Sequence, residues 1–254
     1  METTTKFRKC EQADEGNCTH TLDKVPYREA VGSLMYLVTG TRPDLMFAVC
    51  QLSRFVDHPT EQHIGALKRV VRYLLGTVEK GISYHDRENC EIGVHLQGHS
   101  DCDWANDIDT RKSTTGYVCT LMGGAISWAS RRQTIVGQST AEAEYIAACE
   151  AAMEGKTLMN ILDEMLPEMK HRITLGVDNQ SSYVMATNPT FGRRTCHIEL
   201  KWHYVREQVR KKELYMLKVR SEDNPADLFT KPLAKARFVS LSTKIGMRTR
   251  NVQS

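Results

Sequence analysis

The feature that most constrains this fold is a strand-like run that ends in acidic residues and is followed by two more such runs. Residues 92–97 (IGVHLQ) alternate as a strand does and lead into Asp101 and Asp103, by which point a loop could have begun. Further strand-like runs follow at 113–122 and 125–131, and the Gly-Gly pair between them is a strong hairpin signal. The pattern predicts three hairpin-joined strands, with carboxylates at the end of the first.

Beyond these strands, helical and strand-like patterns alternate. Thr140 is positioned to cap a long helix with a face of small residues, Pro167 ends that helix, and a short apolar strand ends at Asp178. The expected elements are a strand at 82–85, a helix at 141–166, a strand at 173–177, a helix at 197–212, a strand at 215–220 and a last helix beginning near 224–227. This order predicts an α/β protein with a mixed sheet.

The N-terminal part has a different character. Residues 1 to about 24 are polar and without periodicity, which is typical of a disordered lead-in. Helical patterns then run from Tyr27, from 43 to 55 and from 61 to 75, with Thr60 as N-cap and Gly76 as terminator. Their apolar residues exceed what three short helices need for one another: Leu34, Met35, Leu37, Leu45, Phe47, Leu52, Val70 and Leu74. We expect a small helical subdomain with an exposed apolar patch, which is loosely ordered, self-associates or docks on the following domain.

The composition indicates a globular protein but does not identify a binding partner. The 254 residues are 41% hydrophobic and 26% charged, as in an ordinary globular protein, and the net charge of +3 is too small to indicate nucleic acid. Residues 192–220 hold nine Lys/Arg against three Glu, which suits either a polyanionic partner or a solvated helix face.

Cysteine usage and hydropathy bear on the compartment. The eight cysteines form no Cys-x-x-Cys pair and no zinc-ligand spacing, so reduced thiols of a cytosolic or nuclear protein are expected. The sequence has no apolar run of about 18 residues, and its start lacks the apolar core of a secretory signal. We therefore expect neither a membrane span nor secretion.

Four acidic residues lie at the ends or first turns of separate predicted elements. Each has an ordinary explanation: Asp101 could open a turn, Asp178 could cap a helix, and Asp227 could suit the helix dipole. On the long helix, Glu142 and Glu144 point to different faces, and Glu144 lies on the alanine-rich face expected to pack on a sheet. Because an unpaired buried charge is costly, the set as a whole favours a metal-dependent nuclease site for Mg²⁺ or Mn²⁺.

Ordered motifs carry a resemblance to a known family. Six of them resemble the ribonuclease H domain of copia-type LTR retrotransposon Pol polyproteins: 100–105 (SDCDWA), 110–117 (TRKSTTGY), 125–128 (AISW), 139–145 (STAEAEY), 177–181 (VDNQS) and 226–233 (ADLFTKPL). Upstream, four stretches resemble the tail of the reverse transcriptase in the same polyproteins: 27–37, 41–49, 52–55 and 68–77. The resemblance covers about residues 26–247.

The resemblance implies a ribonuclease H-like fold, with a mixed five-stranded sheet flanked by helices and preceded by a small helical subdomain. The implied divisions are a disordered lead-in (1–25), a thumb- or connection-like helical tail of the reverse transcriptase (26–80), a ribonuclease H-like domain (81–247) and a disordered tail (248–254). The implied location is a cytoplasmic virus-like particle or the nucleus. The implied catalytic residues and metal ligands are Asp101, Glu144, Asp178 and Asp227.

The implied substrate is the RNA strand of an RNA/DNA hybrid, cleaved with two Mg²⁺ ions that clamp the scissile phosphate, Mn²⁺ being a possible substitute. The implied partners are this hybrid and the polymerase portion of the polyprotein. Asn179 and Gln180 are candidates for contacts to 2′-hydroxyls. The candidates for phosphate contacts, although such exposed residues are often merely solvated, are Arg111, Lys112, Arg131 and Arg132.

Two departures from the family pattern limit these expectations. The polymerase palm and its paired aspartates are absent, so we expect no nucleotide incorporation by this chain alone. At Cys196 the family more often has Lys or Arg, so one basic contact is weakened. The alternative function is a catalytically silent remnant or a nucleic-acid-binding module without turnover, against which the presence of all four carboxylates argues.

Overall fold

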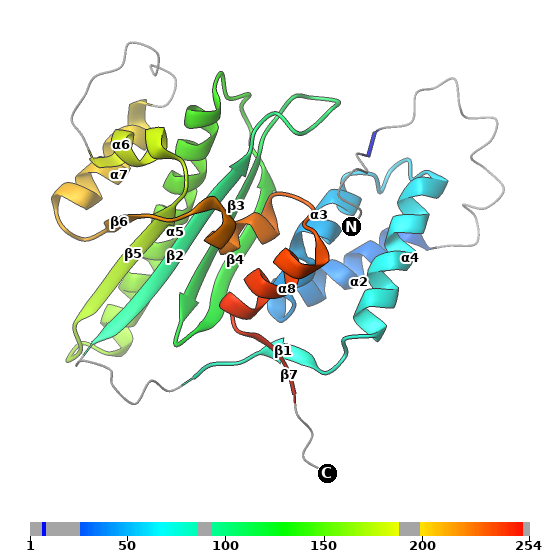
Figure 1. The fold of residues 1–254 in the computed structure, drawn as a ribbon, viewed down its shortest axis with the longest axis horizontal. Helices are drawn as coiled ribbons and strands as arrows, with labels where there is room; N and C mark the ends of the chain where they lie inside the picture. Colours follow the sequence, from blue (N-terminus) through cyan, green and yellow to red (C-terminus); the bar gives the residue numbers. More distant parts are fainter. Residues whose placement is uncertain (1–6, 9–25, 86–92, 188–198, 251–254) are drawn as a thin grey trace.

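The computed structural model describes residues 7–8, 26–85, 93–187 and 199–250 (Figure 1). Its order of elements is a helical segment, a strand meander, a long helix and then alternating strands and helices. Within the described residues, no helix combines the length and the apolar character that a membrane span requires. Cys196 and the start of the helix expected at 197–212 lie outside the described residues.

The helical segment comprises α2 (Tyr27–Gly40), the 3-10 turn η2 (Pro43–Leu45), α3 (Met46–Ser53) and α4 (Glu61–Leu75). The expected N-cap of α4 is confirmed: Thr60 has extended backbone geometry, and its N–H donates to Nδ1 of His63 at 2.9 Å. Gly76 follows α4 as its C-cap, also as expected. The helix expected at 43–55 instead begins with a 3-10 turn, in which Pro43 fixes the first position.

Five strands form the main sheet in the order β4-β3-β2-β5-β6. They are β2 (Val94–Asp103), β3 (Thr114–Leu121), β4 (Gly124–Arg132), β5 (His171–Val177) and β6 (Tyr215–Lys218). The pairs β2–β3 and β3–β4 are antiparallel, whereas β2–β5 and β5–β6 are parallel. The predicted mixed sheet is confirmed.

The hairpin between β3 and β4 forms where it was expected, one residue earlier than the Gly-Gly pair suggested. Met122 and Gly123 both have positive φ, at 51° and 75°, which is the backbone geometry that matches the twist of a tight hairpin. Gly124 already belongs to β4.

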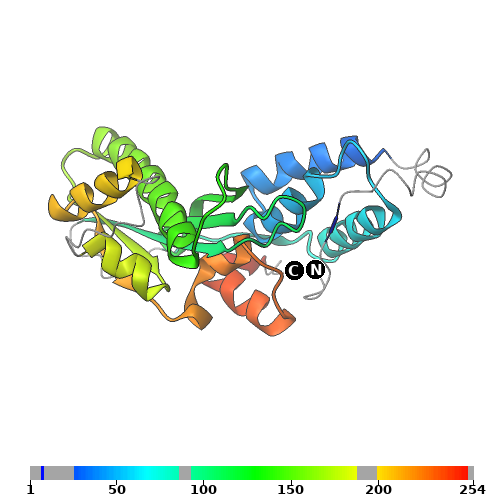
Figure 2. The same cartoon turned by 90° about the horizontal axis from the view of Figure 1, so that it is seen from above.

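Three helices cover one face of the sheet: α5 (Thr140–Met165), α6 (Gln180–Thr187) and α7 (Glu199–Arg210) (Figures 1 and 2). Their buried residues share a core with one set of strand residues, among them Leu96, Tyr117 and Cys119. Helix α6 was not among the expected elements, although Asp178 was noted as a possible cap of a following helix.

The opposite face carries the C-terminal elements and the helical segment. After η4 (Ser221–Asp223), the helix expected near 224–227 is the 3-10 helix η5 (Pro225–Phe229), and the α-helix α8 (Lys235–Lys244) begins later. Proline at the start of η5 and a second proline at 232 interrupt the regular α-helical pattern. Val118, whose side chain points away from Cys119, packs in this second core with η5 and α8.

A small second sheet joins the ends of this region. Strand β1 (Lys80–Ile82) pairs antiparallel with β7 (Met247–Thr249). Residues 248 and 249 therefore lie in a strand and not in the expected tail, and the strand expected at 82–85 begins earlier. Residues 251–254 of the expected tail lie outside the described residues, as does most of the lead-in, although Phe7 packs against Phe55 and His63.

The helical segment docks on the sheet. Its buried residues, such as Val38, Val49 and Leu52, share one core with Val118 and Phe229. The indole Nε1 of Trp128 donates to the carbonyl of Val38 at 2.8 Å across this contact. The eight apolar residues named for the expected exposed patch are all buried or partly buried, so the prediction is wrong for these residues. Of the three alternatives, docking on the following domain is confirmed; the division at 80/81 stays a prediction.

Candidate metal centre

The site begins at the end of β2, the central strand. Asp101 is only 1% exposed. Strand β2 continues through Asp103, where the sequence also allowed a loop to have begun. The parallel partner β5 is in register with β2 at His99 and Gly176, so the carboxyl ends of both strands lie at one edge of the sheet. Asp178 follows β5 at this edge, close to Asp101.

The first turns of α5 bring the third carboxylate. Ser139, not Thr140, is the N-cap, and its hydroxyl accepts from the N–H of Glu142 at 3.2 Å. The Glu142 carboxylate turns back to accept from the N–H of Gln138 at 2.7 Å. Glu144, two positions further, faces Asp101 and Asp178 instead. The prediction that these glutamates point to different places is confirmed.

A buried amide fixes the start of α5 against the sheet. The side-chain nitrogen of Gln133 donates to the carbonyl of Ala143 at 2.9 Å and to the hydroxyl of Thr115 at 3.0 Å. Small side chains, Cys102, Ala143 and Ala147, pack at this junction. The close packing lets the Glu144 side chain reach the end of the central strand.

Asp101, Glu144 and Asp178 form one group. One carboxylate oxygen of each lies within 4.8 Å of the others, and the first two side chains are buried. Burial, together with the charges of Asp101 and Asp178, raises the pKa of Glu144 to about 9. Close, buried carboxylates repel one another unless a cation neutralises them, and three oxygen ligands of this kind suit a hard divalent ion. The residues present therefore fit Mg²⁺ or Mn²⁺.

Asp227 lies beside this group and has partners of its own. It is fully buried in η5, its Oδ1 is 2.7 Å from Nζ of Lys231, and its Oδ2 accepts from Arg237. Burial and the charge of Asp101 raise its pKa to about 7, against the opposing effect of Lys231 and Arg237. Asp227 is thus near the group of three, but it is engaged in ion pairs.

Lys231 links Asp227 to the central strand. Its Nζ also lies 3.2 Å from Oδ2 of Asp101, and the hydroxyl of Thr230 donates to the same oxygen. Although burial would lower it, the charges of Asp101 and Asp227 raise the pKa of Lys231. Thr230 and Lys231 were not among the predicted site residues; the i, i+4 spacing of Asp227 and Lys231 was the available signal for their pairing.

Two contacts hold η5 against the sheet at this point. The Asn224 side chain donates to the carbonyl of Ser100 at 2.9 Å and accepts from the N–H of Ala226 at 3.1 Å. On β3, Gly116 lies opposite Asp101. A Cβ at Gly116 would come within 2.6 Å of the Thr230 side chain, so glycine is what allows the segment to lie so close.

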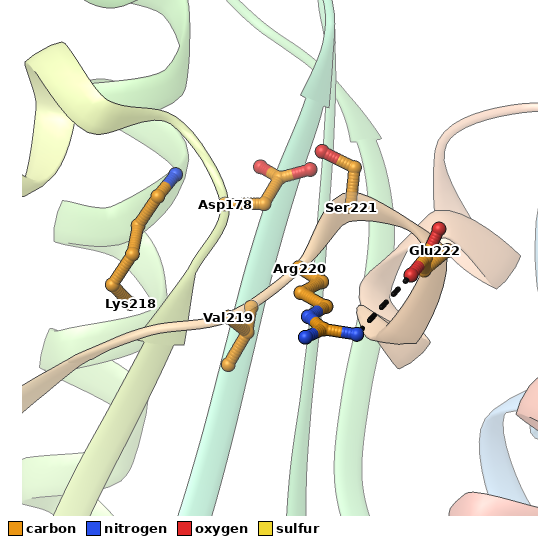
Figure 3. A pocket seen from close by; sticks show the side chains of 6 residues that line it. All are labelled: Asp178, Lys218, Val219, Arg220, Ser221 and Glu222. Atoms are coloured by element: carbon orange, nitrogen blue, oxygen red, sulfur yellow. Dashed lines mark ion pairs between the residues drawn. The ribbon is translucent and has the colours of Figure 1, made fainter.

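An open pocket of about 430 Å³ adjoins the group (Figure 3). It is lined by Asp178 and by the segment from Lys218 to Glu222, which leads from β6 into η4. Nη1 of Arg220 lies 3.8 Å from Oε1 of Glu222, and both side chains are largely exposed. The pocket therefore combines a carboxylate of the candidate metal centre with two basic side chains.

The predicted substrate-binding residues are dispersed around the same end of the sheet. The Asn179 side-chain oxygen caps α6 by accepting from the N–H of Ser182 at 3.0 Å, whereas Gln180 is exposed. Arg132 ends β4 and donates to Asp107 at 2.9 Å, which gives it a structural contact. The other candidates are exposed or partly exposed: Arg111, Lys112 and Arg131.

The chain is similar to Pol polyproteins of plant transposons. The chain is 41% identical over 226 residues to the retrovirus-related Pol polyprotein from transposon TNT 1-94 of Nicotiana tabacum. The matched residues cover 89% of this chain and 17% of that polyprotein. It is 40% identical over 225 residues to the retrovirus-related Pol polyprotein from transposon RE2 of Arabidopsis thaliana, covering 89% and 15%. The chain belongs to the Pol polyprotein family of copia-type retrotransposons.

This Pol segment spans less than a fifth of the length of these two relatives. No family model matches it. Among solved structures, it is similar to RNase H1 from the halophilic archaeon Halobacterium salinarum NRC-1, with 16% sequence identity and a TM-score of 0.39 over 54% of this chain and 94% of that one. The Pol segment folds into a mixed five-stranded sheet flanked by helices, and a helical region precedes this sheet.

Proposed function

We propose that this chain is the ribonuclease H of a retrotransposon Pol polyprotein and hydrolyses the RNA strand of RNA/DNA hybrids with two divalent ions. The observation that carries the proposal is the group of Asp101, Glu144 and Asp178, drawn from three elements, with oxygens within 4.8 Å of one another. Membership of the Pol family supports it, because synthesis of DNA on RNA leaves a hybrid whose RNA strand has to be removed.

The four carboxylates have distinct surroundings and thus distinct proposed roles. Asp101, Glu144 and Asp178 would hold the metal, Mg²⁺ or alternatively Mn²⁺, and Asp227 would complete the set from η5. When bound, such ions activate a water molecule as nucleophile and stabilise the leaving oxygen of the phosphodiester. Thr230 and Gln133 would act as positioning residues, the first by its hydrogen bond to Asp101 and the second by anchoring α5.

Exposed polar residues around the centre are suited to the substrate. Lys218 and Arg220 line the pocket next to Asp178 and would bind phosphates on one side. Arg131, exposed near the end of β4, is available for the same purpose on the other side. Gln180, exposed two residues after Asp178, remains the better candidate for reading a 2′-hydroxyl, since Asn179 is used in the helix cap.

The polymerase portion of the polyprotein is the proposed protein partner. The helical segment resembles the tail of the reverse transcriptase, and it still presents large apolar side chains after docking on the sheet. Tyr36, Leu75 and Val78 are 86%, 69% and 65% exposed. A contact with the polymerase would cover them.

The test is cleavage of an RNA/DNA hybrid with a labelled RNA strand, analysed on a denaturing gel. We expect RNA fragments in Mg²⁺ and none in EDTA, and no cleavage of the same sequence as double-stranded DNA. Hybrid binding without cleavage in Mg²⁺ or Mn²⁺ would support the alternative, a nucleic-acid-binding module without turnover.

A further inference from the structure

An ammonium group already bridges two carboxylates of the candidate centre. Nζ of Lys231 lies 2.7 Å from Oδ1 of Asp227 and 3.2 Å from Oδ2 of Asp101. Asp101 belongs to the group of three that fits a divalent ion, and Asp227 does not. The lysine thus stands on the side of Asp101 that faces Asp227.

The net charge of the carboxylates and their cationic partners can be neutralised by one divalent ion. Binding of a divalent ion displaces the proton that burial favours on Glu144. The four carboxylates, those of Asp101, Glu144, Asp178 and Asp227, are then ionised and meet two cationic side chains, Lys231 and Arg237. Two negative charges remain, which a single divalent cation neutralises. A second ion next to Asp101 and Asp227 would face the ammonium group of Lys231 at short range and be repelled.

We propose that Lys231 is a resident cation at the second position of the metal centre, so that the chain binds one divalent ion tightly and a second only when Lys231 leaves Asp101. This inference rests on the proposed function for the role of the metal, but not for the ion pairs themselves. Occupancy of the second position by an ion would then depend on the movement of Lys231 away from Asp101, and not on ion concentration alone.

The surroundings of Lys231 allow such a movement. Its side chain is 35% exposed, whereas the carboxylates of Asp101 and Asp227 are 2% and 0% exposed. A lysine has a flexible four-carbon stem, so its charge can withdraw to solvent or to a substrate phosphate. Asp227 would keep Arg237 as a partner, and Asp101 would keep the hydroxyl of Thr230.

The test is binding of Mn²⁺ alone, without nucleic acid, to the full chain, measured by calorimetry and by electron paramagnetic resonance. For the wild type we expect one tight site and a second that is at least about tenfold weaker. Lys231→Met keeps the apolar stem and removes the charge, and should strengthen the second site by about tenfold or more. Lys231→Arg keeps the charge and should retain the wild-type pattern.

Lys235→Met, at an exposed position of α8, is the control for the loss of one positive charge. It should leave both sites unchanged. If Lys231→Met folds only in the presence of Mn²⁺, the ion has taken the place of the ammonium group, which also supports the inference.

Two equal Mn²⁺ sites in the wild type would overturn the inference, whatever the variants do. So would an unchanged second site in a folded Lys231→Met protein. The outcome is separate from the proposed function: hybrid cleavage with an unchanged binding pattern removes this inference alone. A strengthened second site without any cleavage removes the proposed function alone.

Discussion

Nη2 of Arg54 lies 2.6 Å from Oδ1 of Asp107, and this ion pair joins the helical segment to the loop between β2 and β3. The Asp107 carboxylate is only 2% exposed and also accepts from Thr110 and Arg132. Although burial would raise it, these hydrogen bonds and the charge of Arg54 hold the pKa of Asp107 well below its ordinary range. The loop that follows the acidic end of β2 is therefore fastened to another part of the chain.

Replacement of Asp107 should be costly. Asp107→Ala leaves Arg54, 19% exposed, without its buried partner, and we expect a loss of about 3 kcal/mol in the free energy of unfolding. The control is Asp57→Ala, which breaks an exposed pair with Arg28, at 76% and 71% exposure, and should cost less than about 1 kcal/mol. Urea unfolding measures the free energy of unfolding of both variants. Equal losses would show that the buried contacts of Asp107 stabilise the fold no more than an exposed ion pair does.

The helical segment should be needed for a soluble fold. Deletion of residues 1–79 removes one side of the core that contains Val118, Leu228 and Phe229, and exposes these residues to water. We expect the fragment to aggregate or to bind a hydrophobic dye, as measured by size-exclusion chromatography and dye fluorescence. A monomeric fragment with a cooperative unfolding transition would show instead that the division at 80/81 is a true domain boundary.

Stability should fall in mild acid because of two histidines, since burial lowers the pKa of His99 to about 4 as it does for His63. His63 is fully buried, its Nδ1 accepts from Thr60, and burial lowers its pKa to about 4. The unfolded chain takes up a proton near pH 6.5 but the folded protein does not, so the stability present above about pH 6.5 is lost toward pH 4. The contribution of His63 to this slope is at most about 1.4 kcal/mol per pH unit.

His63→Gln should reduce this slope by the share of one group, since glutamine at this position of the capping box can still accept from Thr60 and His99 is unchanged. His58→Gln, at an exposed position, is the matched control and should keep the wild-type slope. Urea unfolding at pH 7, 6 and 5 provides the comparison. The same slope in wild type and His63→Gln would assign the acid sensitivity to other groups.

The two glutamates of α5 should behave differently. Glu144→Gln removes a ligand from the group of three and should weaken Mn²⁺ binding by at least about tenfold, because a neutral amide is a poorer ligand than a carboxylate. Glu142→Gln can still accept from Gln138 and should cost no more than about 1 kcal/mol of stability. Calorimetric titration decides, and similar losses of binding in both variants would contradict the geometry.

Local patterns in the sequence were sufficient to predict several features of the structure. The alternation leading into Asp101 placed it at a strand end, and helix geometry separated Glu144 from Glu142. Both inferences depend only on residues close in sequence. Helix α6 was missed because its short sequence has little amphipathic pattern, and because its cap is Asn179 and not Asp178.

Contacts between distant segments could not be predicted in this way. The bond from Asn224 to Ser100 and the ion pair from Lys231 to Asp101 depend on how closely η5 packs on the sheet at Gly116. Docking of the helical segment likewise follows from complementary apolar surfaces, whose match is a property of the folded chain. The sequence showed an excess of apolar residues there, but not what would cover them.

The most direct test of the central claim is the single-turnover rate of RNA cleavage in an RNA/DNA hybrid, in Mg²⁺, for the wild type and for Asp101→Asn. Asp101 is the residue that the metal group, Thr230 and Lys231 share. We predict cleavage by the wild type and a rate at least about a thousandfold lower for the folded variant, since loss of a buried ligand removes the metal chemistry. A folded Asp101→Asn protein that cleaves at the wild-type rate would contradict the account.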